Sequence, residues 1–111
     1  MRLYYRIASY LLLIGLVHTA LTPLFYPGFT LEALWFAGTG LALVFLALLN
    51  ITAERLMLRW VLDLCLAADI IGTLFGILIV MLLPEIQAYL SLGIFLAVTI
   101  GALGVRRQIR K

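Results

Sequence analysis

The chain consists of four long apolar runs separated by short segments that favour turns. The runs cover about residues 4–25, 31–50, 57–83 and 85–105. Each provides the roughly 20 apolar residues that an α-helix needs to cross the hydrocarbon core of a bilayer. The sequence therefore predicts an all-α membrane protein, an antiparallel bundle of four transmembrane helices that forms a single domain over residues 1–111.

The segments between the runs contain residues that end or begin helices. "TPLFYPGFT" at 22–30 has two prolines and a glycine, and "NITAER" at 50–55 is short and polar, so both are predicted to be loops. Pro84 and Glu85 suit the first turn of the last helix, where proline loses no hydrogen bond and a negative charge meets the positive end of the helix dipole. Connections this short predict antiparallel neighbours.

Composition and charge placement exclude a soluble domain and a nucleic-acid surface. Of the 111 residues 66 % are hydrophobic and 12 % are charged, whereas a soluble domain has about 25 % charged residues. The mean hydropathy is +1.21. The positive-inside rule places both termini in the cytoplasm, because every basic residue lies at the N-terminus, near the 50–59 segment or at the C-terminus. These residues are Arg2, Arg6, Arg55, Arg59, Arg106, Arg107, Arg110 and Lys111.

Aromatic residues are predicted to mark the two membrane interfaces. Asp63 follows Arg59 by four positions, which is the spacing of an ion pair within one helix. The expected aromatic belts are Tyr4, Tyr5 and Trp60 on the cytoplasmic side and Tyr26, Trp35 and Tyr89 on the other side.

Asp69 fits an apolar span least, because it is a carboxylate within hydrocarbon. At helical spacing it shares a face with Cys65, Gly72, Thr73 and Gly76, which are small or weakly polar. Small residues let membrane helices approach closely, so this face is predicted to turn toward another helix. Similar faces are Ala8, Leu11, Gly15, His18 and Thr22 in the first span, Glu32, Thr39 and Asn50 in the second, and Gly93, Ala97, Gly101 and Gly104 in the fourth.

His18, the only histidine, is the predicted partner of Asp69. His18 follows Arg6 by twelve residues and Asp69 follows Arg59 by ten, which puts them about 18 and 15 Å into their spans. A carboxylate at that depth is costly unless it is paired or neutral. The pair either fixes helix register or forms a polar centre that binds a ligand or relays protons. Further candidates for this centre are Glu32, Thr39, Asn50 and Thr73, and the predicted helix-packing residues are Gly72, Gly76, Gly93, Ala97 and Gly101.

Sequence patterns of catalytic and metal sites are missing. The sequence has no CxxC, HExxH or GxSxG motif and no glycine loop that would hold phosphate. One His and one Cys fall short of the four ligands of a structural zinc site, and only a dimer could offer two His18 side chains to a haem. The expectation is therefore a protein without cofactor or metal, more typical of a non-enzyme than of an enzyme.

Two stretches resemble known membrane proteins. "IGLVHT" at 14–19 and "ALWFAGTGLALVFLALLN" at 33–50 are similar to segments of small, uncharacterised bacterial four-helix membrane proteins of the DoxX-like kind. This resemblance covers the first two spans and implies a bacterial inner-membrane location. The small multidrug resistance family shares the size and the four spans, but its first helix contains a glutamate that this chain lacks.

Three functions follow from these features as alternatives. The first is a non-enzymatic inner-membrane protein that binds a hydrophobic small molecule or lipid, or serves as an accessory subunit, with His18 and Asp69 as its polar centre. The second is a proton-coupled transporter that works as a homodimer. The third is a chain that only packs within a larger membrane complex. The lipid bilayer is the expected partner in every case.

Overall fold

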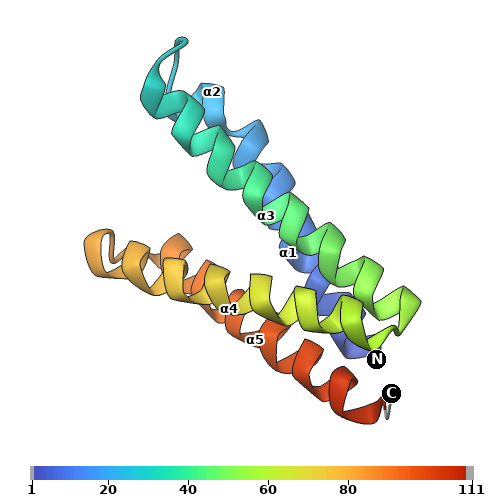
Figure 1. The fold of residues 1–111 in the computed structure, drawn as a ribbon. Coiled ribbons are helices and arrows are strands. Elements are labelled where there is room, and N and C mark those ends of the chain that lie inside the picture. The colour runs from blue at the N-terminus through green and yellow to red at the C-terminus, as the bar shows by residue number, and fades with distance from the viewer. Residues whose placement is uncertain (1, 110–111) are drawn as a thin grey trace.

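The computed structural model describes residues 2–109, and this part of the chain is all-helical (Figure 1). Four of its helices are long and apolar enough to cross a membrane, which confirms the predicted fold class at that level. Arg110 and Lys111, two of the predicted basic anchors, lie outside the described residues. The helices are α1 (Arg2–Ala20), α2 (Thr22–Phe25), α3 (Leu31–Leu56), α4 (Arg59–Leu82) and α5 (Ile86–Gln108), of which all but α2 are the long ones.

The loop predicted at 50–55 is wrong, because α3 continues through it to Leu56. The polar side chains of Thr52 and Arg55 are exposed there while Ala53 is fully buried, so the helix keeps one face against the protein. The helix ends at Met57, which adopts a left-handed φ of 54° and donates its N–H to the Ala53 carbonyl at 3.0 Å. Polar residues therefore mark the end of the apolar span here, and the turn follows only afterwards.

The other turns lie where the sequence predicts them, with small shifts of boundary. The first span breaks at Leu21 into α1 and α2, and Pro23 occupies the first turn of α2. Gly28 has a φ of +106°, which is strained for any residue with a Cβ. Thr30 caps α3, since its hydroxyl accepts the N–H of Ala33 at 3.1 Å. These features together reverse the chain between α1 and α3.

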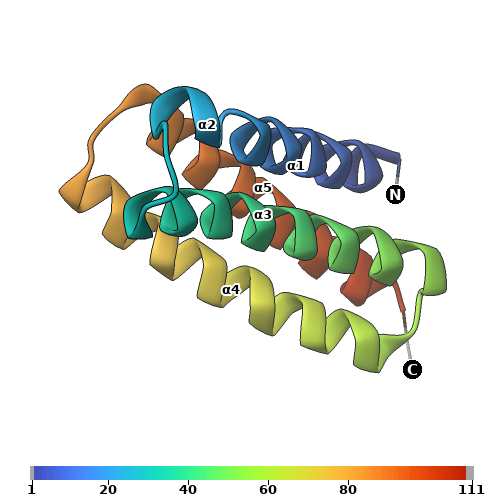
Figure 2. The ribbon, with the colours of Figure 1, turned by 90° about the horizontal axis from the view of Figure 1, so that it is seen from above.

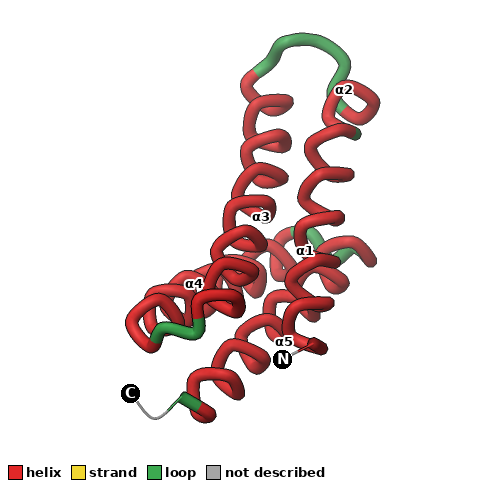
Figure 3. Tube along the Cα trace, turned by 90° about the vertical axis from the view of Figure 1, so that its right-hand side faces the viewer, coloured by secondary structure: helices red, strands yellow, loops and turns green. Residues whose placement is uncertain are grey.

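The helices form two antiparallel hairpins, α1 with α3 and α4 with α5, and the hairpins pack across each other (Figure 2). Figures 1 and 3 show the hairpins meeting near both chain ends and the α3–α4 turn and diverging toward their opposite ends. Contact between the hairpins is consequently concentrated at the end that holds the basic clusters.

Two glycines bring the backbones of α1 and α3 together. A Cβ on Gly15 would stand 2.8 Å from the backbone nitrogen of Val44, and one on Gly40 would stand 2.9 Å from that of Thr19. Such close approach is how membrane helices gain packing energy without a hydrophobic driving force. Gly15 belongs to a face that the sequence predicts, whereas Gly40 does not.

The buried core is small and the outer surface is strongly apolar. Leu11, Leu62 and Val98 are fully buried, while Phe29 and Leu82 are 90 % and 89 % exposed. Large apolar surfaces of this kind are rare in soluble monomers and natural in hydrocarbon.

Replacing Gly40 with alanine should destabilise the α1–α3 hairpin, because the new methyl group meets the Thr19 backbone. We expect a loss of about 1–3 kcal/mol, the usual cost of overpacking. Gly38→Ala is the matched control, since nothing lies within 4 Å of a Cβ there. Thermal unfolding in mild detergent measures both variants, and equal stability of the two would refute the close contact.

Candidate functional site

A buried polar cluster joins three helices at the end where the hairpins meet. Its centre is the Asn50 side chain of α3, whose Oδ1 accepts the Tyr4 hydroxyl of α1 at 2.6 Å and the Cys65 thiol of α4 at 3.0 Å. Its Nδ2 donates to Oδ1 of Asp69, also in α4, at 2.7 Å and to the Leu46 carbonyl at 2.9 Å. Tyr4, Asn50, Cys65 and Asp69 form what we call the polar cluster.

Asp69 is fully buried and has only uncharged hydrogen-bond partners in the described part of the chain. Its Oδ1 accepts from Asn50, and its Oδ2 lies 3.7 Å from the Cys65 sulfur. The Thr73 hydroxyl donates to the Asp69 backbone carbonyl at 2.8 Å. Asp69 therefore faces other helices, as predicted. Its side-chain hydrogen-bond partners are Asn50 and Cys65.

A second polar contact continues from the cluster to the last helix. The Thr73 and Thr99 hydroxyls lie 3.3 Å apart, and Thr99 also donates to the Phe95 carbonyl at 2.7 Å. Hydrogen bonds between membrane helices are worth about 0.6 kcal/mol on average. Polar contacts thus reach all four long helices.

The predicted pairing of His18 with Asp69 is wrong. Nε2 of His18 lies 3.0 Å from the Phe36 carbonyl, and the imidazole stacks on the Phe36 ring with centroids 4.0 Å apart. The α1 residue that reaches the cluster is Tyr4, fourteen residues before His18, or about 21 Å along the helix. Counting residues from the basic anchors fails because the two hairpins cross at an angle, so equal counts do not give equal positions.

Two other residues predicted for the polar centre stand apart from it. Glu32 is exposed in the first turn of α3. The Thr39 hydroxyl donates to the carbonyl of Trp35 in its own helix at 3.0 Å. Of the predicted second-span face, only Asn50 joins the cluster.

The predicted packing glycines divide into two groups. In α4, a Cβ on Gly72 or Gly76 would stand 3.3–3.4 Å from Phe95 of α5, so both glycines face another helix, as predicted. On α5, Gly101 lies against Tyr4, where a Cβ would meet the ring at 2.8 Å. The rest of that strip is not closely packed. Ala97 is partly exposed, and Gly93 and Gly104 are exposed, with nothing within 4 Å of the position a Cβ would take.

Sequence reasoning does not identify two residues of the polar cluster, Tyr4 and Cys65. Tyr4 is only 3 % exposed and belongs to the cluster, so its assignment to an interfacial aromatic belt is wrong. Its spacing from Ala8 and Leu11 extends the first-span face by one turn, which is the signal that could have identified it. Cys65 shares the predicted face of Asp69, where the sequence shows no role for it beyond small size, and its thiol contacts three polar side chains.

At the edge of the molecule an ion pair links the two helices of the second hairpin. Asp63 of α4 pairs with Arg106 of α5, a partner from another helix that the i,i+4 spacing does not reveal. Both side chains are partly exposed, so the pair contributes little to stability.

The polar groups of the cluster are hydrogen-bonded within the protein. Every buried side-chain nitrogen and oxygen of the described residues has a hydrogen-bond partner. Within residues 2–109 no group of three or more His, Cys, Asp and Glu side chains could hold a metal ion. The cluster therefore links α1, α3 and α4 through hydrogen bonds between their side chains.

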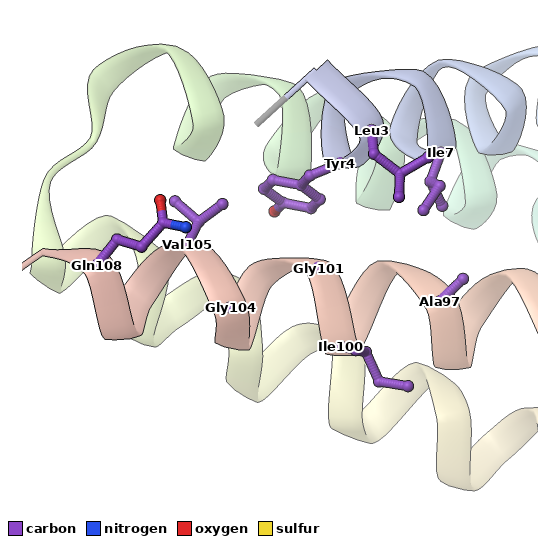
Figure 4. Close-up of a pocket in the computed structure, with 9 residues that line it drawn as sticks. All are labelled: Leu3, Tyr4, Ile7, Ala97, Ile100, Gly101, Gly104, Val105 and Gln108. Carbon is purple, nitrogen blue, oxygen red and sulfur yellow. The ribbon is translucent and has the colours of Figure 1, made fainter.

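Beside the cluster, a shallow apolar groove of about 380 Å³ runs between α1 and α5 (Figure 4). The Tyr4 ring forms part of its wall while the Tyr4 hydroxyl is bound to Asn50. Gly104 leaves the α5 side of the groove open, and Gln108 stands at the end nearest the C-terminus. The lining residues are Leu3, Tyr4, Ile7, Ala97, Ile100, Gly101, Gly104, Val105 and Gln108.

No protein family, curated protein or solved structure matches this chain. The DoxX-like resemblance of the first two spans stays a prediction, and the function is inferred from the polar cluster and the groove.

Coupling energies should distinguish the observed partner of Asp69 from the predicted one. Asn50→Ala and Asp69→Ala should be non-additive by 0.5 kcal/mol or more, as is usual for residues in one hydrogen-bond network (about 0.5–3 kcal/mol). His18→Ala and Asp69→Ala should add within about 0.5 kcal/mol, because they share no partner. Unfolding free energies of the single and double variants in detergent give both cycles. Strong coupling of His18 to Asp69 would contradict the structure.

Proposed function

We propose that this protein is a small, non-enzymatic protein of a bacterial inner membrane that binds one hydrophobic molecule or lipid chain in the groove between α1 and α5. The observation that carries this proposal is the groove itself. Its volume of about 380 Å³ falls within the range of about 300–1,000 Å³ that small-molecule sites occupy. Its lining is apolar apart from the Tyr4 hydroxyl, which is already bonded inside the cluster, and Gln108 at one end.

The polar cluster supports this function by fixing one wall of the groove. Tyr4 is held by its hydroxyl to Asn50, and its ring rests on Gly101. A ring held at both edges keeps α1 and α5 at a set separation. A preformed site costs less ordering entropy on binding, which favours retention of a ligand.

The charge distribution supports an orientation with both termini in the cytoplasm. The chain ends and the α3–α4 turn, where the basic residues lie, are found together at one end of the molecule (Figure 1). The connections at the other ends of the hairpins contain no Lys or Arg. This asymmetry is what the positive-inside rule describes.

One observation favours a second candidate, a proton-coupled transporter that works as a homodimer. Asp69 is a buried carboxyl in a membrane span with no basic partner among the described residues, and intramembrane ionisable groups are commonly functional. A bare dimer together with proton-driven transport that is lost in Asp69→Asn would favour this candidate over ligand binding.

Native mass spectrometry of protein released gently from its own membranes tests the proposed binding. We expect the chain to carry one reproducible additional small-molecule mass. Gly104→Leu should lose that mass, because nothing lies within 4 Å of a Cβ at this groove-lining position and a larger side chain there would occupy the groove. Gly93→Leu is the matched control, since it is an equally open glycine of α5 outside the groove. A mass that is absent from the wild type, or retained equally by both variants, would contradict the proposal.

A further inference from the structure

The groove between α1 and α5 is polar at only one of its ends. On α5 its lining runs from Ala97 to Gln108, about 17 Å along the helix axis. Gln108 is the only residue of that lining on α5 with a polar side chain, and Figure 4 shows its amide beside Val105 at the end of the groove. The site is thus elongated and apolar with one polar end, which suits an amphiphile better than a compact apolar molecule.

The same end of the groove carries an available positive charge. Arg107 is exposed, follows Gly104 by three residues and precedes Gln108, so it lies on the α5 face that borders the groove. Its neighbour Arg106 is already compensated by Asp63. Among the described residues Arg107 takes part in no ion pair. A negative group held at this end would therefore meet a charge that the protein does not use elsewhere.

The position of this end matches that of a lipid headgroup. Gln108 ends α5, and the N-terminus and the α3–α4 turn lie at the same end of the molecule (Figures 1 and 3). Basic residues close to a membrane surface attract anionic lipids, each by about 1 kcal/mol. A phospholipid whose acyl chain entered the groove from the bilayer would place its phosphate at the level of Arg107.

We infer that the occupant of the groove is one anionic glycerophospholipid, with an acyl chain between α1 and α5 and its phosphate at Arg107 and the Gln108 amide. This inference rests on the proposed function and names its ligand class. A second copy of the chain fits the groove less well. In one membrane both copies have the same orientation, so packing along α5 would bring two basic C-terminal segments together.

Lipid competition tests the inference. The protein is exchanged into bilayer discs with equal amounts of phosphatidylglycerol and phosphatidylethanolamine, released in mild detergent and weighed with its bound lipids by native mass spectrometry. We expect one retained lipid per chain, enriched in phosphatidylglycerol. Arg107→Gln should reduce that enrichment about fivefold, the factor that corresponds to about 1 kcal/mol per basic residue, and should leave a lipid bound. Arg55→Gln, an exposed arginine of α3 outside the groove lining, is the matched control and should keep the enrichment.

The possible outcomes distinguish a failure of the anionic-lipid assignment from a failure of the proposed binding function. Retention of one lipid that Gly104→Leu removes, but without preference for phosphatidylglycerol, overturns the inference and leaves the binding function standing. An equal loss of preference in Arg107→Gln and Arg55→Gln also overturns it. Absence of any retained lipid or other small molecule overturns both. A dimer that both Gly93→Leu and Gly104→Leu dissociate, with no lipid bound, assigns the α5 strip to a second copy instead.

Discussion

The arrangement of this protein depends on the hydrogen bonds of one side chain, Asn50. Its amide binds Tyr4 of α1 and Asp69 and Cys65 of α4, and it does so while it is fully buried. A polar side chain in hydrocarbon has no water to bind, so burying it is costly unless it finds a hydrogen-bond partner on another helix or in its own backbone. The two hairpins consequently meet at this point, near the chain ends, and diverge beyond it (Figure 1).

The groove and the polar cluster share one residue, Tyr4. The Tyr4 hydroxyl is bound to Asn50 and the Tyr4 ring lies against Gly101, and both Tyr4 and Gly101 line the groove. Gly104 leaves the remaining space unfilled. The hydroxyl of Tyr4 thus belongs to the polar cluster, and its ring forms part of the groove wall.

The sequence predicts the helices and the first turn, but it does not predict how the two hairpins cross. The apolar runs predict the four long helices, and Gly28 and Thr30 fit the first turn, because these signals act within a few residues. The polar 50–55 segment does not break the helix, because its exposed polar side chains share a helical turn with the buried Asn50 and Ala53. Tyr4 could have been found as an extension of the Ala8–Leu11 face. The choice of Tyr4 over His18 as the α1 residue near Asp69 could not, since it depends on the angle between hairpins, which no local spacing encodes.

The role of Asn50 in joining the two hairpins is tested most directly by nuclear magnetic resonance of its side chain. Asn50 is the only asparagine in the chain, so labelling asparagine with nitrogen-15 yields a single side-chain amide pair. The structure predicts that these amide protons exchange slowly with deuterated solvent and show nuclear Overhauser contacts to the Tyr4 ring. Rapid exchange without any contact to Tyr4 would contradict it, because Asn50 would then not join the two hairpins.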